Sequence, residues 1–152
     1  MSANKIIYQV DAFTSEPFKG NPAGVCILDD EMPDEWMQNI AAEMNLSETA
    51  FIRNGKDSFR IRFFTPTSEI PLCGHATLSS AHIMFETGIV KKDDIIIFSS
   101  KAGILKIRYS DCWVIMNFPA YDLIQAHVPQ DLCNYIVITP EEFYRTDHGW
   151  TF

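Results

Sequence analysis

The chain has 152 residues, of which 47% are hydrophobic and 21% are charged, as in ordinary folded domains and unlike disordered chains. Its formal net charge is -8, and its paired basic residues Lys91 and Lys92 are followed at once by Asp93 and Asp94. Nucleic-acid binding requires a clustered basic face, so nucleic acid is not an expected partner.

Two further sequence features concern the cellular setting. The N-terminal segment is too short in apolar length for a signal peptide, and no run approaches the roughly 18 apolar residues of a membrane span. The four cysteines form no CxxC pair, and Cys26, Cys112 and Cys133 lie among apolar neighbours, so each is predicted to be a small buried residue. We therefore expect a reduced, cytoplasmic protein without membrane contact.

The first half of the chain is predicted to hold four strands and a helix. Apolar patterning predicts the strands at 6–13, 23–28, 46–52 and 59–64. The first two can pair as a hairpin across a turn at 18–22, which contains Gly, Asn and Pro. Pro33 suits a helix start, and apolar residues recur on one face from Trp36 to Met44, with a stop expected at Asn45.

The second half begins with a loop and a helix. Residues 65–73 contain two prolines and are predicted to be a loop, whereas Gly74 to Phe85 is small or apolar on almost every side. Gly88 suits the C-terminal cap, and a helix without a charged face is predicted to be buried at the domain centre. The remaining apolar runs predict strands at 95–98, 104–109 and 112–118 and a last segment at 135–138. The sum is an α+β fold with largely antiparallel strands.

Glu48 is the first candidate for chemistry. It lies at a predicted strand start and shares parity with Leu46, Ala50 and Ile52, which means that their side chains point to the same face of the strand. If that parity faces the interior, burial favours a protonated carboxyl group, and a glutamate that exchanges its proton near neutral pH suits proton transfer. The alternative is an exposed glutamate at a strand end or a turn.

The helix start forms a second candidate. Gly74 opens an apolar helix whose free N–H groups and dipole suit a substrate carboxylate. His75 could donate a hydrogen bond to that anion or relay a proton, and a stabilised Cys73 thiolate could act as a nucleophile or base. The structural alternatives are a glycine needed for close packing, a capping histidine and an inert cysteine.

Two other chemistries are not expected. Cys73 and His75 are only two residues apart, which is poor geometry for a nucleophile and its base. The spacing of Cys73, His75 and His82 matches no standard zinc pattern, and His82 is predicted to pack within the helix. No metal site is therefore predicted.

Five runs of residues together resemble the successive signatures of PhzF-like proteins, in the order of that family. The runs are Val10-Asp-Ala-Phe-Thr14, Phe18-Lys-Gly-Asn-Pro-Ala-Gly-Val25, Leu46-Ser-Glu-Thr-Ala-Phe51, the long run Arg62 to Leu78 with Pro71-Leu-Cys-Gly-His75, and Asn117-Phe-Pro-Ala120. The resemblance covers about four-fifths of the chain and implies one lobe of the diaminopimelate-epimerase fold. Such a lobe is a mixed, largely antiparallel sheet wrapped around a central helix.

The resemblance also implies a cofactor-free isomerase that transfers a proton on a small carboxylate substrate. It places Glu48 at the catalytic glutamate and His75 at an assisting histidine. Cys73 corresponds to a catalytic cysteine of related epimerases. The remaining residues that the resemblance assigns to substrate contacts are Asn21, Ser47, Gly74, Ala76 and Thr77.

The domain boundaries follow from where the resemblance stops. We predict a PhzF-like lobe at residues 1–120 and a divergent extension at 121–152, which packs on the lobe or on a partner chain. Residues 121–152 lack the Asp-Pro-x-Thr-Gly-Ser-Ala type motif of the family's second lobe. The expected alternatives are an isomerase lobe that is closed by another chain, as a homo-oligomer, and a truncated paralogue that binds a small anion or a partner protein.

Overall fold

The computed structural model describes residues 5–129, 132–134 and 141–146. The chain divides into two compact units, residues 1–119 and residues 120–152, which are treated separately below. The predicted apolar segment at 135–138 lies outside the described residues.

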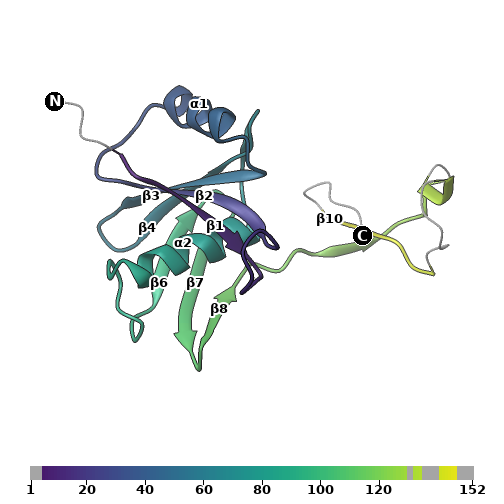
Figure 1. Ribbon diagram of the computed structural model, residues 1–152. Coiled ribbons are helices and arrows are strands. Elements are labelled where there is room, and N and C mark those ends of the chain that lie inside the picture. Colours follow the sequence, from purple (N-terminus) through teal and green to yellow (C-terminus); the bar gives the residue numbers. More distant parts are fainter. Residues whose placement is uncertain (1–4, 130–131, 135–140, 147–152) are drawn as a thin grey trace. The chain divides into compact units, whose positions relative to one another are not determined.

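The first unit contains one eight-stranded sheet (Figure 1). Its strands are β1 (Ile7–Ala12), β2 (Asn21–Leu28), β3 (Glu48–Asn54), β4 (Phe59–Phe64), β5 (Glu69–Ile70), β6 (Ile96–Ser100), β7 (Gly103–Ser110) and β8 (Trp113–Asn117). The order is β1-β2-β3-β4-β6-β7-β8, and β5 pairs with β4. The pairs β2–β3 and β4–β6 are parallel, and the other pairs are antiparallel. The predicted β1–β2 hairpin is confirmed, whereas the expected loop at 65–73 contains β5.

Helix α2 (Gly74–Glu86) is the centre of this unit. It contacts β1, β2 and β3, and it also contacts β8 at the opposite end of the strand order, so the sheet curls around it (Figure 1). Ala76, Ala81 and Met84 are fully buried against the inward side chains of the strands. The predicted central helix and the α+β fold with its largely antiparallel sheet are confirmed.

Helix α1 (Asp34–Met44) covers the opposite face of β2, β3 and β4. Met37 and Ala41 pack there in a second buried cluster with Cys26, Phe51 and Phe64. Strands β2 and β3 are therefore buried on both faces, which explains why their sequences are apolar at nearly every position. The helix ends at Asn45, as predicted, in the left-handed conformation.

The second unit contains a short antiparallel pair and one helical turn. Strand β9 (Leu123–Gln125) pairs with β10 (Tyr144–Thr146), and the 3-10 turn η1 spans Leu132–Asn134. The Ala126 N–H donates to the Phe143 carbonyl at 2.9 Å and extends this pairing. The side chain of Cys133 lies outside what the structure describes, so its predicted burial stays a prediction.

The prediction for Cys112 is wrong. Asp111 and Cys112 have φ values of 50° and 65° and connect β7 to β8, where Ser110 pairs with Trp113. Two central residues with positive φ make the two-residue hairpin turn that suits the twist of paired strands. Cys112 is exposed in this turn, whereas Cys26 is buried as expected.

No helix in the described ranges is long and apolar enough to cross a membrane.

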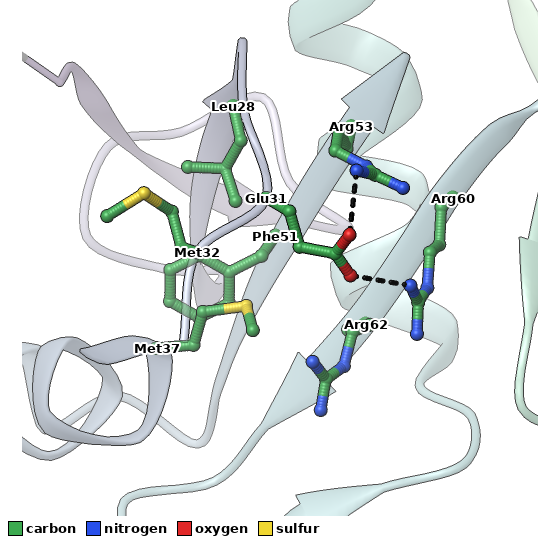
Figure 2. A pocket seen from close by; sticks show the side chains of 8 residues that line it. All are labelled: Leu28, Glu31, Met32, Met37, Phe51, Arg53, Arg60 and Arg62. Carbon is green, nitrogen blue, oxygen red and sulfur yellow. Dashed lines mark hydrogen bonds and ion pairs between the residues drawn. The ribbon is translucent and has the colours of Figure 1, made fainter. Parts of the chain in front are cut away.

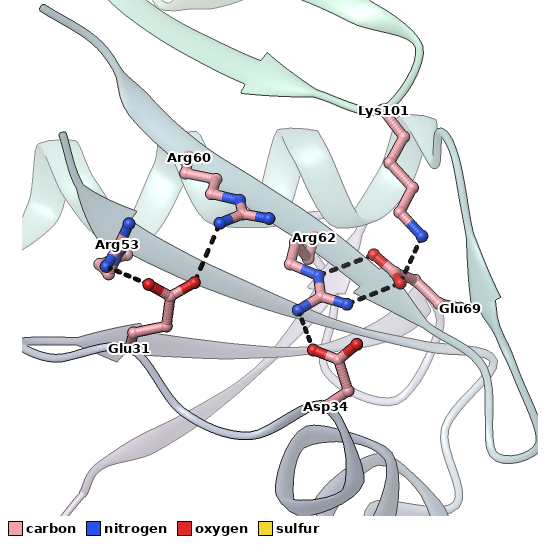
Figure 3. A network of polar contacts seen from close by, with 7 residues as sticks. All are labelled: Glu31, Asp34, Arg53, Arg60, Arg62, Glu69 and Lys101. Carbon is pink, nitrogen blue, oxygen red and sulfur yellow. Dashed lines mark hydrogen bonds and ion pairs between the residues drawn. The ribbon is translucent and has the colours of Figure 1, made fainter.

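An arginine on β4 anchors the loop that leads to α2 (Figure 3). The Arg62 guanidinium donates from Nε and Nη2 to the two carboxylate oxygens of Glu69, at 2.8 and 2.7 Å, and from Nη1 to Asp34 at 2.6 Å. The Arg62 and Glu69 side chains are only 12% and 13% exposed, so solvent screens the pair weakly. Because β5 precedes α2 by four residues, this pair holds the segment that delivers the helix start.

Replacing Glu69 with Gln is expected to lower the free energy of unfolding by about 2 kcal/mol at neutral pH, because charge-assisted hydrogen bonds to Arg62 are lost. The Arg62 guanidinium lowers the pKa of the Glu69 carboxyl, so the wild-type advantage is present above the ordinary glutamate range. It disappears as the pH falls through the lowered pKa. Urea unfolding of both proteins from neutral to acidic pH measures this difference.

Glu31→Gln is the matched control. Glu31 bridges Arg53 and Arg60 at 3.1 Å each, but its side chain is 65% exposed (Figure 3). Exposed ion pairs contribute little, so we expect a loss below about 1 kcal/mol. Equal losses for Glu31→Gln and Glu69→Gln would contradict the role assigned to the Arg62–Glu69 pair.

Candidate active site

Glu48 begins β3 and lies on the side of the sheet that faces α2. Ala50 and Ile52, which share its parity, are fully buried in the cluster around α2. The Glu48 side chain is itself only 17% exposed. The expected inward parity is therefore confirmed, and the alternative of a solvent-exposed glutamate is excluded.

His75 connects Glu48 to the start of α2. Its Nε2 lies 3.2 Å from Glu48 Oε2 and 3.1 Å from Ser47 Oγ, and its Nδ1 lies 3.3 Å from Cys73 Sγ. The Glu48 contact has ion-pair distance but not hydrogen-bond geometry, so Glu48 Oε2 is buried without a hydrogen-bond donor from the described residues. Residues from β3 and from α2 thus meet at one place, as the sequence predicted.

The expectation of a stabilised Cys73 thiolate is wrong. Burial raises the pKa of the Cys73 thiol to about 12, and the Glu48 carboxylate raises it further. The N–H groups of Ala76 and His75 at the helix start lower this pKa but do not offset burial. At neutral pH the group is a thiol, and its sulfur lies within hydrogen-bond distance of His75 Nδ1.

The helix start has free space on its outer side. A Cβ built on Gly74 meets nothing within 4 Å, so close packing does not explain this glycine. The side chains of Ala76 and Thr77 are buried, and the Thr77 hydroxyl and N–H both donate to the Cys73 carbonyl, at 2.6 and 3.1 Å. Asn21 is exposed at the start of β2. The substrate contacts assigned to these residues stay predictions.

The contact between Ser47 and His75 is one that sequence reasoning missed. Ser47 also donates to the Pro22 carbonyl at 3.5 Å, so its hydroxyl lies between β2 and α2. Ser47 lies just before the first residue of β3. Outside a strand, side chains do not alternate regularly between two faces, so the sequence does not predict where its side chain points. The prediction for His82 is also wrong, because this histidine is exposed on α2.

A cavity on the α1 face is too small to be a substrate site. It is lined by Leu28, Glu31, Met32, Met37, Phe51, Arg53, Arg60 and Arg62 (Figure 2). Its volume of about 20 Å³ has room for roughly one water molecule. It also opens on the face of β3 opposite to Glu48. The candidate active site is the cluster around Glu48 and His75, which lies on the other face of β3.

Comparison with solved structures first defines the fold. A hydroxyproline epimerase from Agrobacterium vitis aligns with a TM-score of 0.59 over 87% of this chain and 47% of its own, although the sequences are 12% identical. A PhzF-family phenazine biosynthesis protein from Enterococcus faecalis aligns with a TM-score of 0.79 and 38% identity, over 91% of this chain and 53% of its own. The fold is thus the epimerase-like one expected from the resemblance.

Comparison of sequences then identifies the family. The model of the PhzC-PhzF family, phenazine biosynthesis-like proteins, matches residues 10–136, and the chain belongs to this family. An uncharacterized isomerase of Halalkalibacterium halodurans is 47% identical over 135 residues, which are 88% of this chain and 51% of that protein. The human phenazine biosynthesis-like domain-containing protein is 44% identical over 133 residues, 82% of this chain and 44% of its own. The chain spans about half the length of these curated relatives.

Replacing Gly74 with Ala is expected to keep the fold and raise the free energy of unfolding by up to about 1 kcal/mol, because alanine favours helix and the added methyl meets open space. Urea unfolding provides the measurement. A loss of ligand binding in this stable variant then reflects blocked space at the helix start.

Gly24→Ala is the matched control for the unfolding measurement. A Cβ on Gly24 would lie 2.8 Å from Thr49 Oγ1 and 2.9 Å from its Cγ2, inside the sheet. We expect this variant to lose about 1–3 kcal/mol from overpacking. A larger loss for Gly74→Ala than for Gly24→Ala would contradict the open space at the helix start.

Proposed function

We propose that this chain is a lobe of a cofactor-free isomerase, in which Glu48 removes a proton from a small carboxylate substrate and returns it at another position. The observation that carries the proposal is the buried Glu48 Oε2, 3.2 Å from His75 Nε2 and without a hydrogen-bond donor from the described part of the chain. A carboxylate with a free lone pair in a poorly hydrated place is suited to accept a proton. Membership in an isomerase-containing family supports the same reaction class.

His75 is proposed to assist this transfer. His75 Nε2 lies 3.2 Å from Glu48 Oε2, so this nitrogen is placed to relay a proton to the carboxyl group or to contact a substrate that binds beside it. The start of α2 is proposed to bind the substrate carboxylate in the open space beside Gly74, aided by the helix dipole. Carboxyl and imidazole groups are sufficient to move a proton, so the proposal includes no cofactor.

The experiment is solvent hydrogen exchange into candidate small carboxylates, followed by NMR in D2O. We expect Glu48→Gln to slow exchange by about 100- to 10,000-fold, because the amide cannot act as the base. Glu43→Gln removes an exposed glutamate on α1 and is expected to exchange at the wild-type rate. Unchanged exchange in Glu48→Gln would exclude Glu48 as the base.

The second candidate function is binding of a small anion without turnover, as in a non-catalytic paralogue. The open space beside Gly74 at the helix start favours anion binding whether or not proton transfer follows. Calorimetric titration with the same carboxylates separates the two functions. Binding by wild type without any proton exchange supports this second function, whereas exchange supports the isomerase.

We also propose that two chains associate to enclose Glu48 and His75. The loop between β1 and β2 presents Phe13 and Phe18 at 71% and 96% exposure, and it leads into Asn21 at the end of β2 that lies beside Glu48. Both phenylalanines have a φ of 65°, a strained conformation for such a side chain that costs about 1–2 kcal/mol. Exposed aromatic residues held at this cost favour a contact surface.

Light scattering is expected to give a dimer for the wild type and a monomer for the double variant Phe13→Ser/Phe18→Ser. Ile89→Ser is the control, because Ile89 is also exposed but follows the far end of α2, and that end lies about 17 Å along the helix from His75. A wild type that is monomeric over the concentration range of the exchange assay would exclude this association.

A further inference from the structure

Three side chains that can bind a metal ion meet at the start of α2. The carboxylate of Glu48, the sulfur of Cys73 and a ring nitrogen of His75 all lie within 4.8 Å of one another. Carboxylate oxygen, thiolate sulfur and imidazole nitrogen are the protein ligands of Zn²⁺. The sequence did not predict this set, because the third donor comes from β3 and not from the exposed His82 on α2.

Glu48 and Cys73 each lie near ligand spacing from His75, but beside different nitrogens of its ring. Bonds of about 2.0–2.3 Å place the ligand atoms of a tetrahedral Zn²⁺ roughly 3.3–3.8 Å apart. The Glu48 Oε2–His75 Nε2 distance is 3.2 Å, and the Cys73 Sγ–His75 Nδ1 distance is 3.3 Å. A single ion can bind only one of the two His75 ring nitrogens. The Cys73 or the Glu48 side chain therefore has to rotate to bring its donor atom to the side of the nitrogen that binds the ion.

A second observation points to a cation at this place. Glu48 Oε2 is buried and accepts no hydrogen bond from the described residues, so its lone pairs are available to a bound cation. A Zn²⁺ ion together with the Glu48 carboxylate and a Cys73 thiolate has zero net charge. This neutral complex relieves the burial of the carboxylate, whereas a thiolate alone would add a second negative charge.

We propose that Glu48, Cys73 and His75 form a binding site for a divalent transition-metal ion, Zn²⁺ in particular. On binding, the Cys73 thiol releases its proton to solvent and a sulfur–metal bond forms, without any change of oxidation state. Three protein ligands leave the fourth position to water or to a substrate carboxylate. The ion occupies the Glu48 oxygen and the His75 ring, so it inhibits proton transfer, a consequence that rests on the proposed function.

The metal site is tested with Co²⁺ added to the full chain, because a cobalt–thiolate bond has a charge-transfer absorption in the near ultraviolet. We expect this absorption in wild type and in Cys112→Ser, which removes the exposed cysteine, and its loss in Cys73→Ser. Absence of the band in wild type, or an equal band in Cys73→Ser, would overturn the proposal. Zn²⁺ must displace Co²⁺ and abolish the band.

A second pair of variants keeps the thiol and tests the other two ligands. Calorimetric titration with Zn²⁺ is expected to show at least about 10-fold weaker binding for His75→Gln and for Glu48→Gln than for wild type. Glu43→Gln is the control with unchanged affinity. Equal Zn²⁺ affinity in wild type, His75→Gln and Glu48→Gln would refute the site even if Cys73→Ser does not fold.

The inhibitory consequence has its own readout. Zn²⁺ is expected to stop wild-type hydrogen exchange, and a chelator is expected to restore it. Exchange that continues with the site saturated by Zn²⁺ would refute inhibition. Cobalt and zinc binding without any hydrogen exchange in the metal-free protein would support the metal site and count against the proposed isomerase.

Discussion

Burial of α2 is the constraint on which the rest of the structure depends. From Gly74 to Phe85 this helix has no Asp, Glu, Lys or Arg, so most of its surface is suited to burial. The sheet curls around the helix and buries it, so that strands from both ends of the strand order contact it. Once the helix is enclosed, its first turn meets the start of β3, and Glu48 and His75 come together from segments far apart in the chain.

The chemistry at this meeting point follows from partial burial. Glu48, Cys73 and His75 are shielded enough for their charges to matter to one another, and Gly74 leaves the outer side of the helix start open. Burial acts differently on the groups. It keeps the Cys73 sulfur protonated, and it leaves one Glu48 oxygen without a donor from the described residues. A protonated thiol beside His75 and an available carboxylate are compatible with acid–base work and with metal binding, which therefore compete for the same atoms.

Most of the fold could be predicted from local sequence patterns. The uncharged run after Gly74 predicts a central helix, Asn45 predicts the end of α1, and the alternation at Glu48 predicts its inward direction, since each depends only on neighbours in the chain. Family signatures suggested the roles that we propose for Glu48 and His75, which no spacing alone specifies.

Features that depend on pairing between distant segments could not be predicted. β5 pairs with β4, where Glu69 also reaches Arg62, and nothing near Glu69 in the sequence indicates that partner. Cys112 lies among apolar residues, yet the β7–β8 register makes it part of a tight turn. The protonation state of Cys73 likewise depends on how deeply its sulfur is buried, because the helix start alone favours the thiolate.

The left-handed Asn45 has a consequence for how this chain tolerates changes of length. It stops α1 two residues before β3 begins, and β3 then runs parallel to β2 with Ala23 opposite Glu48. Deleting one residue between Asn45 and Glu48 would bring Thr49 to the position that faces His75, and adding one would turn the Glu48 carboxylate to the opposite face of the sheet. Insertions and deletions at this short connection are thus far more restricted than in the loops at the sheet's outer edges.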